Sequence, residues 1–232
     1  AGPGRLRDDW RWHHRRMDST RLLLVRHGET AWNADGRLQG HLDIALNDTG
    51  RAQARRLAAA LMDEREPIDI LYSSDLARAL QTAQAVADAT GAPLIATPAL
   101  RERHFGAFQG RRFADIAAEL PEQAERWRRR DPDWTPPQGG ESLLQFKERV
   151  TQAVCALAAK NIGKHVALFT HGGVLDVLYR AATGLGLQDA RTWRLDNAAI
   201  NRLLWTPDGG LTLVGWADSF HLDDEARDER FT

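Results

Sequence analysis

The sequence is short of cysteine and of net charge, and each shortage excludes a class of protein. Cys155 is the one cysteine among 232 residues. No disulfide can form within the chain, so we expect a small buried thiol in a reducing compartment. The 31 basic residues almost cancel the 32 acidic ones, which leaves a formal net charge of −1. A polyanion would meet no overall basic field, and we expect no nucleic-acid partner.

Long apolar runs and the spacings of metal ligands are also absent. No stretch approaches the roughly 18 consecutive apolar residues of a membrane span. The opening of the chain lacks the apolar core of a secretory signal, so we expect a cytoplasmic protein with no membrane partner. There is no H-E-x-x-H motif, no C-x-x-C pair and no carboxylate-rich magnesium loop. We therefore expect no metal and no other cofactor.

Short apolar runs alternate with amphipathic helical periods along most of the chain. The runs predict buried strands at 21–25, 68–72, 165–170, 199–205 and 211–216. Helices are predicted from a cap at Asp48 or Thr49 to Leu61, from Asp75 to near Gly91, from a cap at Ser142 to Gly163, and from Gly172 onward. This alternation predicts an α/β three-layer sandwich, in which helices cover both faces of a mostly parallel sheet.

One segment departs from the alternation. Residues 101–140 hold two short helical stretches, 113–120 and 122–130, followed by a proline-rich breaker at 131–137. Such an insert typically lies over the mouth of an α/β sheet, and we expect a lid over the active site. Around it, we expect 1–20 to be an N-terminal arm or extension, 21–220 to form one domain and 221–232 to be a charged tail.

Polar residues follow the carboxyl ends of several predicted strands, where ligands bind in open α/β sheets. Arg26 and His27 follow the first strand, Arg78 follows the second, Glu102 follows a short apolar segment, and His171 follows the strand that ends at residue 170. Two arginine forks together with helix N-terminal N–H groups make a site for an oxyanion. The ligand expected here is a phosphate.

The chemistry of these side chains suggests a role for each of them. Neighbouring arginines depress the pKa of a histidine, so His27 is expected to present a neutral imidazole as nucleophile toward phosphorus. His171 is expected to donate a hydrogen bond to the phosphoryl oxygens, and Glu102 to protonate the leaving alcohol. The rival interpretation is a zinc site that includes His41 and His104, against which two arginines beside the cation would act.

The ten residues from Leu24 to Asn33, L-V-R-H-G-E-T-A-W-N, resemble the signature of the histidine phosphatase superfamily, which includes the cofactor-dependent phosphoglycerate mutases. The resemblance covers roughly residues 20–216. It continues through the blocks at 36–40, 46–50, 73–82, 100–106, 139–142 and 170–173.

The resemblance implies a reaction through a phosphohistidine on His27, with Glu102 as proton donor and no metal. Arg26, Arg78 and His171 would form the phosphate pocket. Further substrate-binding residues expected from these blocks are Asn33, Gln39, Gly40, Arg103 and Gly172.

Three departures from the mutases favour a phosphatase of the broad-specificity or α-ribazole type, acting on a small phosphorylated metabolite. Where the mutases have a tyrosine this chain has Phe105, and where they have His-Gly-Asn it has a second glycine, Gly173. Its insert is also shorter. A cofactor-dependent phosphoglycerate mutase is the alternative, since Glu102, Arg103 and His104 match the mutases. A catalytically silent phosphate-binding protein is the second alternative.

The sequence alone leaves open the role of one arginine run and the oligomeric state. The arginine run of the insert, at positions 126 and 128–130, is read as the solvated face of a short helix, with recognition of a second anionic group as the alternative. The sequence assigns no strand edge or apolar stripe to an interface, so a homodimer is neither predicted nor excluded.

Overall fold

The computed structural model describes residues 18–223, so most of the expected arm and tail lies outside the described residues. Six strands form one sheet in the order β3-β2-β4-β1-β5-β6. They are β1 (Thr20–Arg26), β2 (Ile70–Ser74), β3 (Leu94–Thr97), β4 (His165–Thr170), β5 (Ile200–Thr206) and β6 (Gly210–Asp218). The first four in chain order are parallel, and β5 and β6 add an antiparallel edge. The predicted mostly parallel sheet is confirmed.

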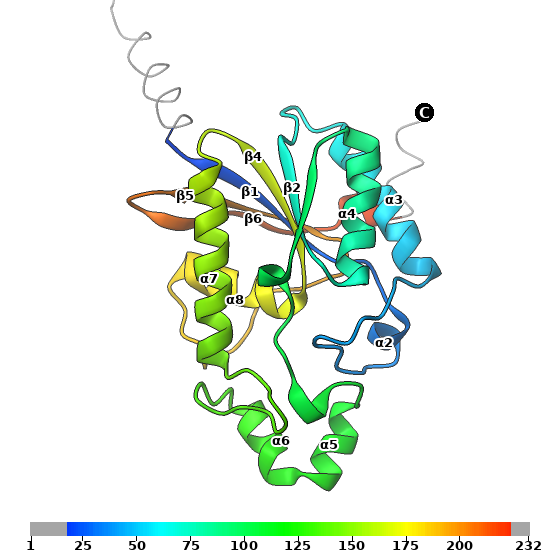
Figure 1. Cartoon of the computed structure of the whole chain (residues 1–232), viewed down its shortest axis with the longest axis vertical. Coiled ribbons are helices and arrows are strands. Elements are labelled where there is room, and N and C mark those ends of the chain that lie inside the picture. Colours follow the sequence, from blue (N-terminus) through cyan, green and yellow to red (C-terminus); the bar gives the residue numbers. More distant parts are fainter. Residues whose placement is uncertain (1–17, 224–232) are drawn as a thin grey trace, which may run out of the picture.

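Helices cover both faces of this sheet (Figure 1). On one side lie α3 (Asp48–Met62) and α4 (Ala77–Thr90), and on the other lie α7 (Leu143–Lys160) and α8 (Gly172–Thr183). Alternate residues of β1 serve the two layers, because successive side chains of a strand point to opposite faces. Leu22 and Leu24 pack in the cluster with α7 and α8, and Leu23 and Val25 pack in the cluster with α3 and α4. The three-layer sandwich is confirmed.

The ends of the helices show which of the predicted boundaries are right and which are wrong. Ser142 caps α7 in a capping box with Gln145, as predicted. α3 is capped by Asn47, whose side chain accepts the Gly50 N–H, and the predicted cap at Asp48 or Thr49 is wrong. α4 ends at Gly91 in the left-handed conformation that glycine adopts readily. The segment before position 100, which was not predicted as a strand, contributes the edge strand β3.

The insert has a small core of its own. It holds the 3₁₀ turn η2 (Gly106–Phe108), α5 (Phe113–Glu119) and α6 (Pro121–Arg128), and Figure 1 shows α5 and α6 at the end of the molecule away from the sheet. Phe108, Ile116, Ala124 and Trp134 pack together in it, with Trp127 against them. The two remaining 3₁₀ turns are η1 (Pro98–Leu100) and η3 (Phe220–Leu222), and a short helix, α2 (Ala31–Ala34), follows β1.

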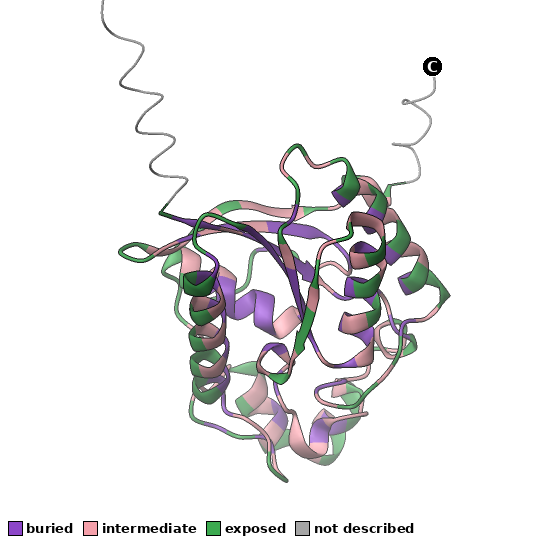
Figure 2. Ribbon diagram, turned by 45° about the horizontal axis from the view of Figure 1, so that its top comes forward, coloured by how far each residue is buried: buried purple, intermediate pink, exposed green. Residues whose placement is uncertain are grey.

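Burial follows the layers. Figure 2 shows the central strands buried between helices whose outer faces are exposed. Every residue of β4 is buried. Cys155 is partly exposed and packs against the core cluster on the α7 side, so the predicted full burial of its thiol is wrong. Within residues 18–223, none of the helices has the length and apolar character needed to cross a membrane.

Candidate active site

Two histidines leave the sheet side by side because two parallel strands end in register. Arg26, the last residue of β1, pairs with Thr170, the last residue of β4. The next residue along each strand is a histidine, and the centroids of the His27 and His171 rings lie 5.3 Å apart. Both side chains are buried. The fold therefore brings together two residues that are 144 positions apart in the chain (171 − 27).

His27 is held in the tautomer that a nucleophile needs. Its Nδ1 lies 2.7 Å from the carbonyl oxygen of Gly28, and because a carbonyl can only accept, the proton sits on Nδ1. Nε2 then keeps its lone pair. Burial, and after it the positive charges of Arg26 and Arg78, holds the pKa of His27 well below its ordinary value. The imidazole is neutral near pH 7.

The backbone around His27 is fixed from three sides. The N–H of Gly28 donates to Thr82 Oγ1 of α4 at 3.0 Å, and Asn197 Nδ2 donates to the carbonyl oxygen of His27 at 2.8 Å. Gly28 also packs against the backbone of Gly50, where a Cβ would come within 2.6 Å of a carbonyl oxygen. A glycine after the histidine is required by this close approach.

Arg78 projects from the first turn of α4, and loop carbonyls hold its guanidinium. Nη1 donates to Leu42 O at 2.8 Å and Nη2 donates to Gly40 O at 2.7 Å. Arg26 Nη1 donates in the same way to Leu195 O. Burial lowers the pKa of Arg78 to about 10, so the group keeps its positive charge at neutral pH. Both guanidinium groups are rigid and charged before any ligand arrives.

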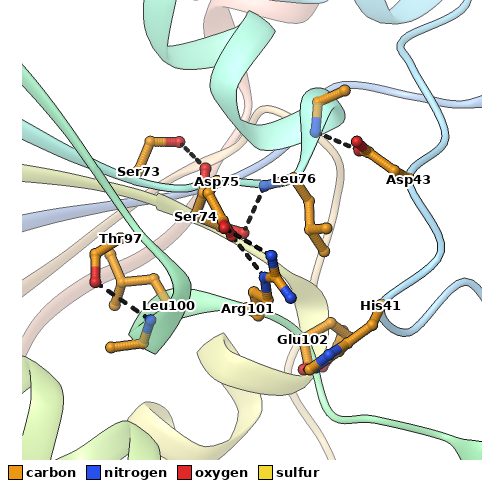
Figure 3. Close-up of polar contacts among 12 residues, drawn as sticks. His41, Asp43, Ser73, Ser74, Asp75, Leu76, Thr97, Leu100, Arg101 and Glu102 are labelled. Atoms are coloured by element: carbon orange, nitrogen blue, oxygen red, sulfur yellow. Dashed lines mark hydrogen bonds and ion pairs between the residues drawn. The ribbon is translucent and has the colours of Figure 1, made fainter.

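The first turn of α4 is itself held by neighbouring loops (Figure 3). Asp43 Oδ1 accepts the N–H of Ala77 at 2.7 Å and so caps a helix whose own cap residue has no side-chain hydrogen bond. Arg101 places its fork on both carboxylate oxygens of Asp75, at 2.6 and 2.7 Å. These contacts fix the position of Arg78 relative to the segment that carries Glu102.

Three buried nitrogens in this group have no hydrogen-bond partner among the described residues. They are Arg26 Nε, Arg78 Nε and His171 Nδ1. A buried polar group without a partner costs free energy, about 1–3 kcal/mol each, so such groups cluster where a ligand completes the bonding. An oxyanion fits this set, since both guanidinium groups are cations and can only donate.

Glu102 lies against the N-terminus of α8. Its Oε1 accepts the N–H of Arg103 at 2.8 Å and its Oε2 accepts the N–H of Gly173 at 3.0 Å. A Cβ at position 173 would lie 2.2 Å from Glu102 Oε1, so a glycine there leaves room for the carboxylate in this position. The carbonyl oxygen of Glu102 accepts hydrogen bonds from His41 Nε2 at 2.8 Å and from Arg149 Nη2 at 3.1 Å.

A cavity of about 400 Å³ opens over these groups. Of the predicted site residues, the ones that line it are Arg26, His27, Asn33, Gln39, Gly40, Arg78, Glu102 and Gly172. His171 lies behind this surface, fully buried. Asn33 Oδ1 is occupied by the N–H of Thr30, so the amide NH₂ of Asn33 is the group that it can offer a ligand.

Arg103 is placed elsewhere. Its Nε donates to the carbonyl oxygen of Glu141 at 2.8 Å, and its guanidinium lies over the Trp127 ring at 5.3 Å. It braces the insert and is not among the residues that line the cavity. Of the arginine run, Arg126 pairs with Asp131, and the arginines at 128 and 129 pair with Glu125 on the exposed face.

The cavity also has residues that the sequence did not single out. Arg37, Asp176, Arg191 and Leu195 line it, and Arg130 joins them from the end of the insert. Arg191 and Leu195 belong to the irregular stretch between α8 and β5, which has no periodicity or motif to mark it. Of these five residues, Arg130 alone was considered as a ligand-binding residue from the sequence, as part of the arginine run.

No metal cluster competes with this arrangement in the described part of the chain. Residues 18–223 contain no group of three or more His, Cys, Asp or Glu side chains that could hold a metal ion. The rings of His41 and His104 meet edge to face with their centroids 4.7 Å apart, but the first donates to a carbonyl oxygen and the second accepts the N–H of Gly106.

Comparisons with known proteins agree with this geometry. The chain matches the model of the histidine phosphatase superfamily (branch 1) over residues 22–219. The metal-independent phosphoserine phosphatase of Arabidopsis thaliana is 38% identical over 204 residues, which cover 88% of this chain and 83% of that protein. The probable phosphoglycerate mutase GpmB of Erwinia tasmaniensis is 35% identical over 217 residues, covering 90% and 97%.

A solved structure gives the same result at the level of the fold. The native structure of a mycobacterial glucosyl-3-phosphoglycerate phosphatase is similar with a TM-score of 0.75 and 32% identity, covering 87% of this chain and 100% of that one. The match spans the sheet, the helices and the strand ends that carry the two histidines. The chain belongs to the histidine phosphatase superfamily.

Proposed function

We propose that this protein is a phosphoric monoester hydrolase that works through a phosphohistidine on His27. One observation carries the proposal: a buried, neutral imidazole with an available Nε2 stands beside three buried nitrogens that lack partners among the described residues. That set matches a phosphoryl group, with a nucleophile on one side and donors around its oxygens. The phosphatase names of relatives on both comparisons support the same reaction.

The reaction takes two steps. His27 Nε2 attacks phosphorus, an N–P bond forms, the ester P–O bond breaks, and Glu102 gives its proton to the leaving alcohol oxygen. Water then attacks the phosphohistidine, and the Glu102 carboxylate takes a proton from that water as the N–P bond breaks. Arg26, Arg78 and His171 stabilise the charge on the phosphoryl oxygens throughout. Inorganic phosphate leaves and His27 is again neutral.

We further propose that the substrate is a small phosphorylated metabolite whose leaving group carries a carboxylate. Three further arginines line the cavity, namely Arg37, Arg130 and Arg191. Arg37 pairs with Asp35 and Arg130 pairs with Asp176, whereas Arg191 has no ion pair among residues 18–223. An unpaired arginine at the mouth of a phosphate site is suited to a second anionic group.

The insert 101–140 is proposed as the lid of this site. It contributes Phe105 and Arg130 to the cavity wall, and Arg130 Nη2 reaches Asp176 of α8 at 2.8 Å. A single domain over 21–220 and a reducing cytoplasmic location stay predictions. Sedimentation would decide whether the protein forms a homodimer.

A turnover panel tests the proposal. We expect release of inorganic phosphate from several phosphomonoesters, with the highest kcat/KM for carboxylated substrates. Arg191→Gln should lower kcat/KM for those about 10-fold, the loss of one charge-assisted hydrogen bond, and leave p-nitrophenyl phosphate unaffected. Arg194→Gln, at an exposed arginine paired with Asp196, is the matched control. Equal effects of both variants on both substrates would refute the carboxylate assignment.

A phosphoglycerate mutase is the second candidate, supported by the probable mutase among the relatives. Transfer back to a phosphoglycerate requires a site that excludes water. Supplying 3-phosphoglycerate with and without its bisphosphate separates the two reactions. A hydrolase releases phosphate in both cases, whereas a mutase forms the isomeric phosphoglycerate and depends on the bisphosphate.

A further inference from the structure

His171 makes one hydrogen bond through its ring, and the partner is a serine. Its Nε2 lies 2.8 Å from Ser74 Oγ, at the end of β2, and both residues are fully buried. Its Nδ1 is also buried and has no partner among the described residues. Ser74 is the last residue of β2, just before the short connection to α4, and Figure 3 shows it beside Leu76.

The direction of this hydrogen bond follows from the other contact of the serine. Ser74 Oγ accepts the backbone N–H of Leu76 at 3.3 Å, so one lone pair of the oxygen is in use (Figure 3). Its single hydrogen still needs an acceptor, and His171 Nε2 is the acceptor that the described structure supplies. A hydroxyl that donates to Nε2 requires the imidazole proton to sit on Nδ1.

We infer that Ser74 is a positioning residue that fixes His171 as the Nδ1–H tautomer, so that its second nitrogen is a donor toward the bound phosphoryl group. This inference rests on the proposed function. Burial and the nearby arginines hold the pKa of His171 well below its ordinary value, so the ring is neutral and only one of its nitrogens carries a proton. In the other tautomer, with the proton on Nε2, the Nδ1 of His171 would turn a lone pair toward the bound anion.

The two histidines of the site are thus given opposite roles by their partners. A carbonyl oxygen, which can only accept, puts the proton of His27 on Nδ1 and leaves Nε2 as a nucleophile. A hydroxyl hydrogen on Nε2 of His171 leaves its Nδ1–H as a donor. An imidazole is thus a nucleophile at His27 and a hydrogen-bond donor at His171. In each ring, the hydrogen bond made by one nitrogen decides whether the other nitrogen offers a lone pair or a proton.

The tautomer is measured directly by long-range ¹H–¹⁵N NMR on protein with labelled histidine, with the His171 signals assigned through His171→Gln. The wild-type protein should show His171 with a protonated Nδ1 and an unprotonated Nε2. This readout needs no substrate and no turnover, so it stands or falls separately from the phosphohistidine reaction. An Nε2–H pattern in the wild-type protein would overturn the inference.

A pair of variants completes the test. Ser74→Ala should lose the fixed tautomer and lower kcat about 10- to 100-fold, in the range of one lost oxyanion donor or below it. Ser73→Ala is the matched control, since Ser73 is equally buried and donates to a backbone carbonyl instead. A Ser74→Ala protein that keeps both the tautomer and the wild-type kcat would contradict the inference. If that variant does not fold, the wild-type spectrum decides alone.

Discussion

Gly173 stands where any side chain would collide with the proposed proton donor. A Cβ built at this position lies 2.2 Å from Glu102 Oε1, 3.0 Å from its Cδ and 3.2 Å from Phe146 Cε1. Gly173→Ala therefore forces the carboxylate to retreat by about 1 Å, a displacement that can cost about 100-fold in rate. The fold should tolerate the change, because the displaced atoms end a flexible side chain and alanine favours a helix over glycine by about 1 kcal/mol.

The assay compares two leaving groups. An alkyl phosphate needs a proton on its leaving oxygen, whereas p-nitrophenyl phosphate releases a stable anion without one. We expect kcat/KM, which reports the steps up to release of the alcohol and not the later attack of water, to fall about 100-fold for the alkyl substrate in Gly173→Ala, which is about 2.7 kcal/mol. The kcat/KM for the nitrophenyl substrate should change much less. Gly215→Ala is the control, since a Cβ there meets no atom within 4 Å.

Two results would contradict this prediction for Gly173→Ala. If kcat/KM falls equally for both substrates, the substitution has damaged the phosphate site and not the proton donor. If neither loses activity, the position of Glu102 against the N-terminus of α8 does not matter for catalysis, and the role given to Glu102 fails. Thermal melting of both variants separates these results from a general loss of stability.

Three further predictions use the same structure. In phosphate-free buffer the free energy of unfolding should fall as pH drops below about 6.5, because burial depresses the pKa of His171 and the unfolded chain takes up the proton first. His171→Gln should lessen that slope by about 1.4 kcal/mol per pH unit at most, as measured by urea unfolding between pH 7.5 and 5.5, and an unchanged slope would contradict the assigned burial. Gly28→Ala should destabilise the protein by about 1–3 kcal/mol in the same assay, because its Cβ would lie 2.6 Å from the immobile carbonyl of Gly50. Activity should survive EDTA, and a loss restored by zinc or magnesium would overturn the metal-free reaction.

Much of the site could be predicted because parallel strands deliver their last residues to one edge. His27 and His171 each directly follow the last residue of a strand, so the predicted alternation of strands and helices was enough to place them at the same edge of the sheet. The sequence also shows a glycine, Gly28, directly after His27. Its close approach to Gly50, in contrast, depends on the packing of α3 and could not be read from the chain.

Two of the residues that the sequence missed come from irregular backbone. Asn197 and Arg191 lie between α8 and β5, where no period or motif marks a position, and they reach the site through the path of that loop alone. Arg103, which was expected to bind substrate, lies outside the cavity lining for a different reason. It follows Glu102 directly in an extended segment, where consecutive side chains point to opposite sides. Glu102 lines the cavity and Arg103 turns into the insert.

Trapping the covalent intermediate tests the proposed phosphohistidine mechanism most directly. The protein is mixed briefly with a ³²P-labelled substrate, quenched in alkali and digested, and the labelled peptide is identified by mass spectrometry. We expect phosphate on His27 and no labelled peptide from His27→Ala, which should also lose hydrolysis while keeping its fold. Turnover by a protein that never carries the label, or a label on another residue, would contradict it.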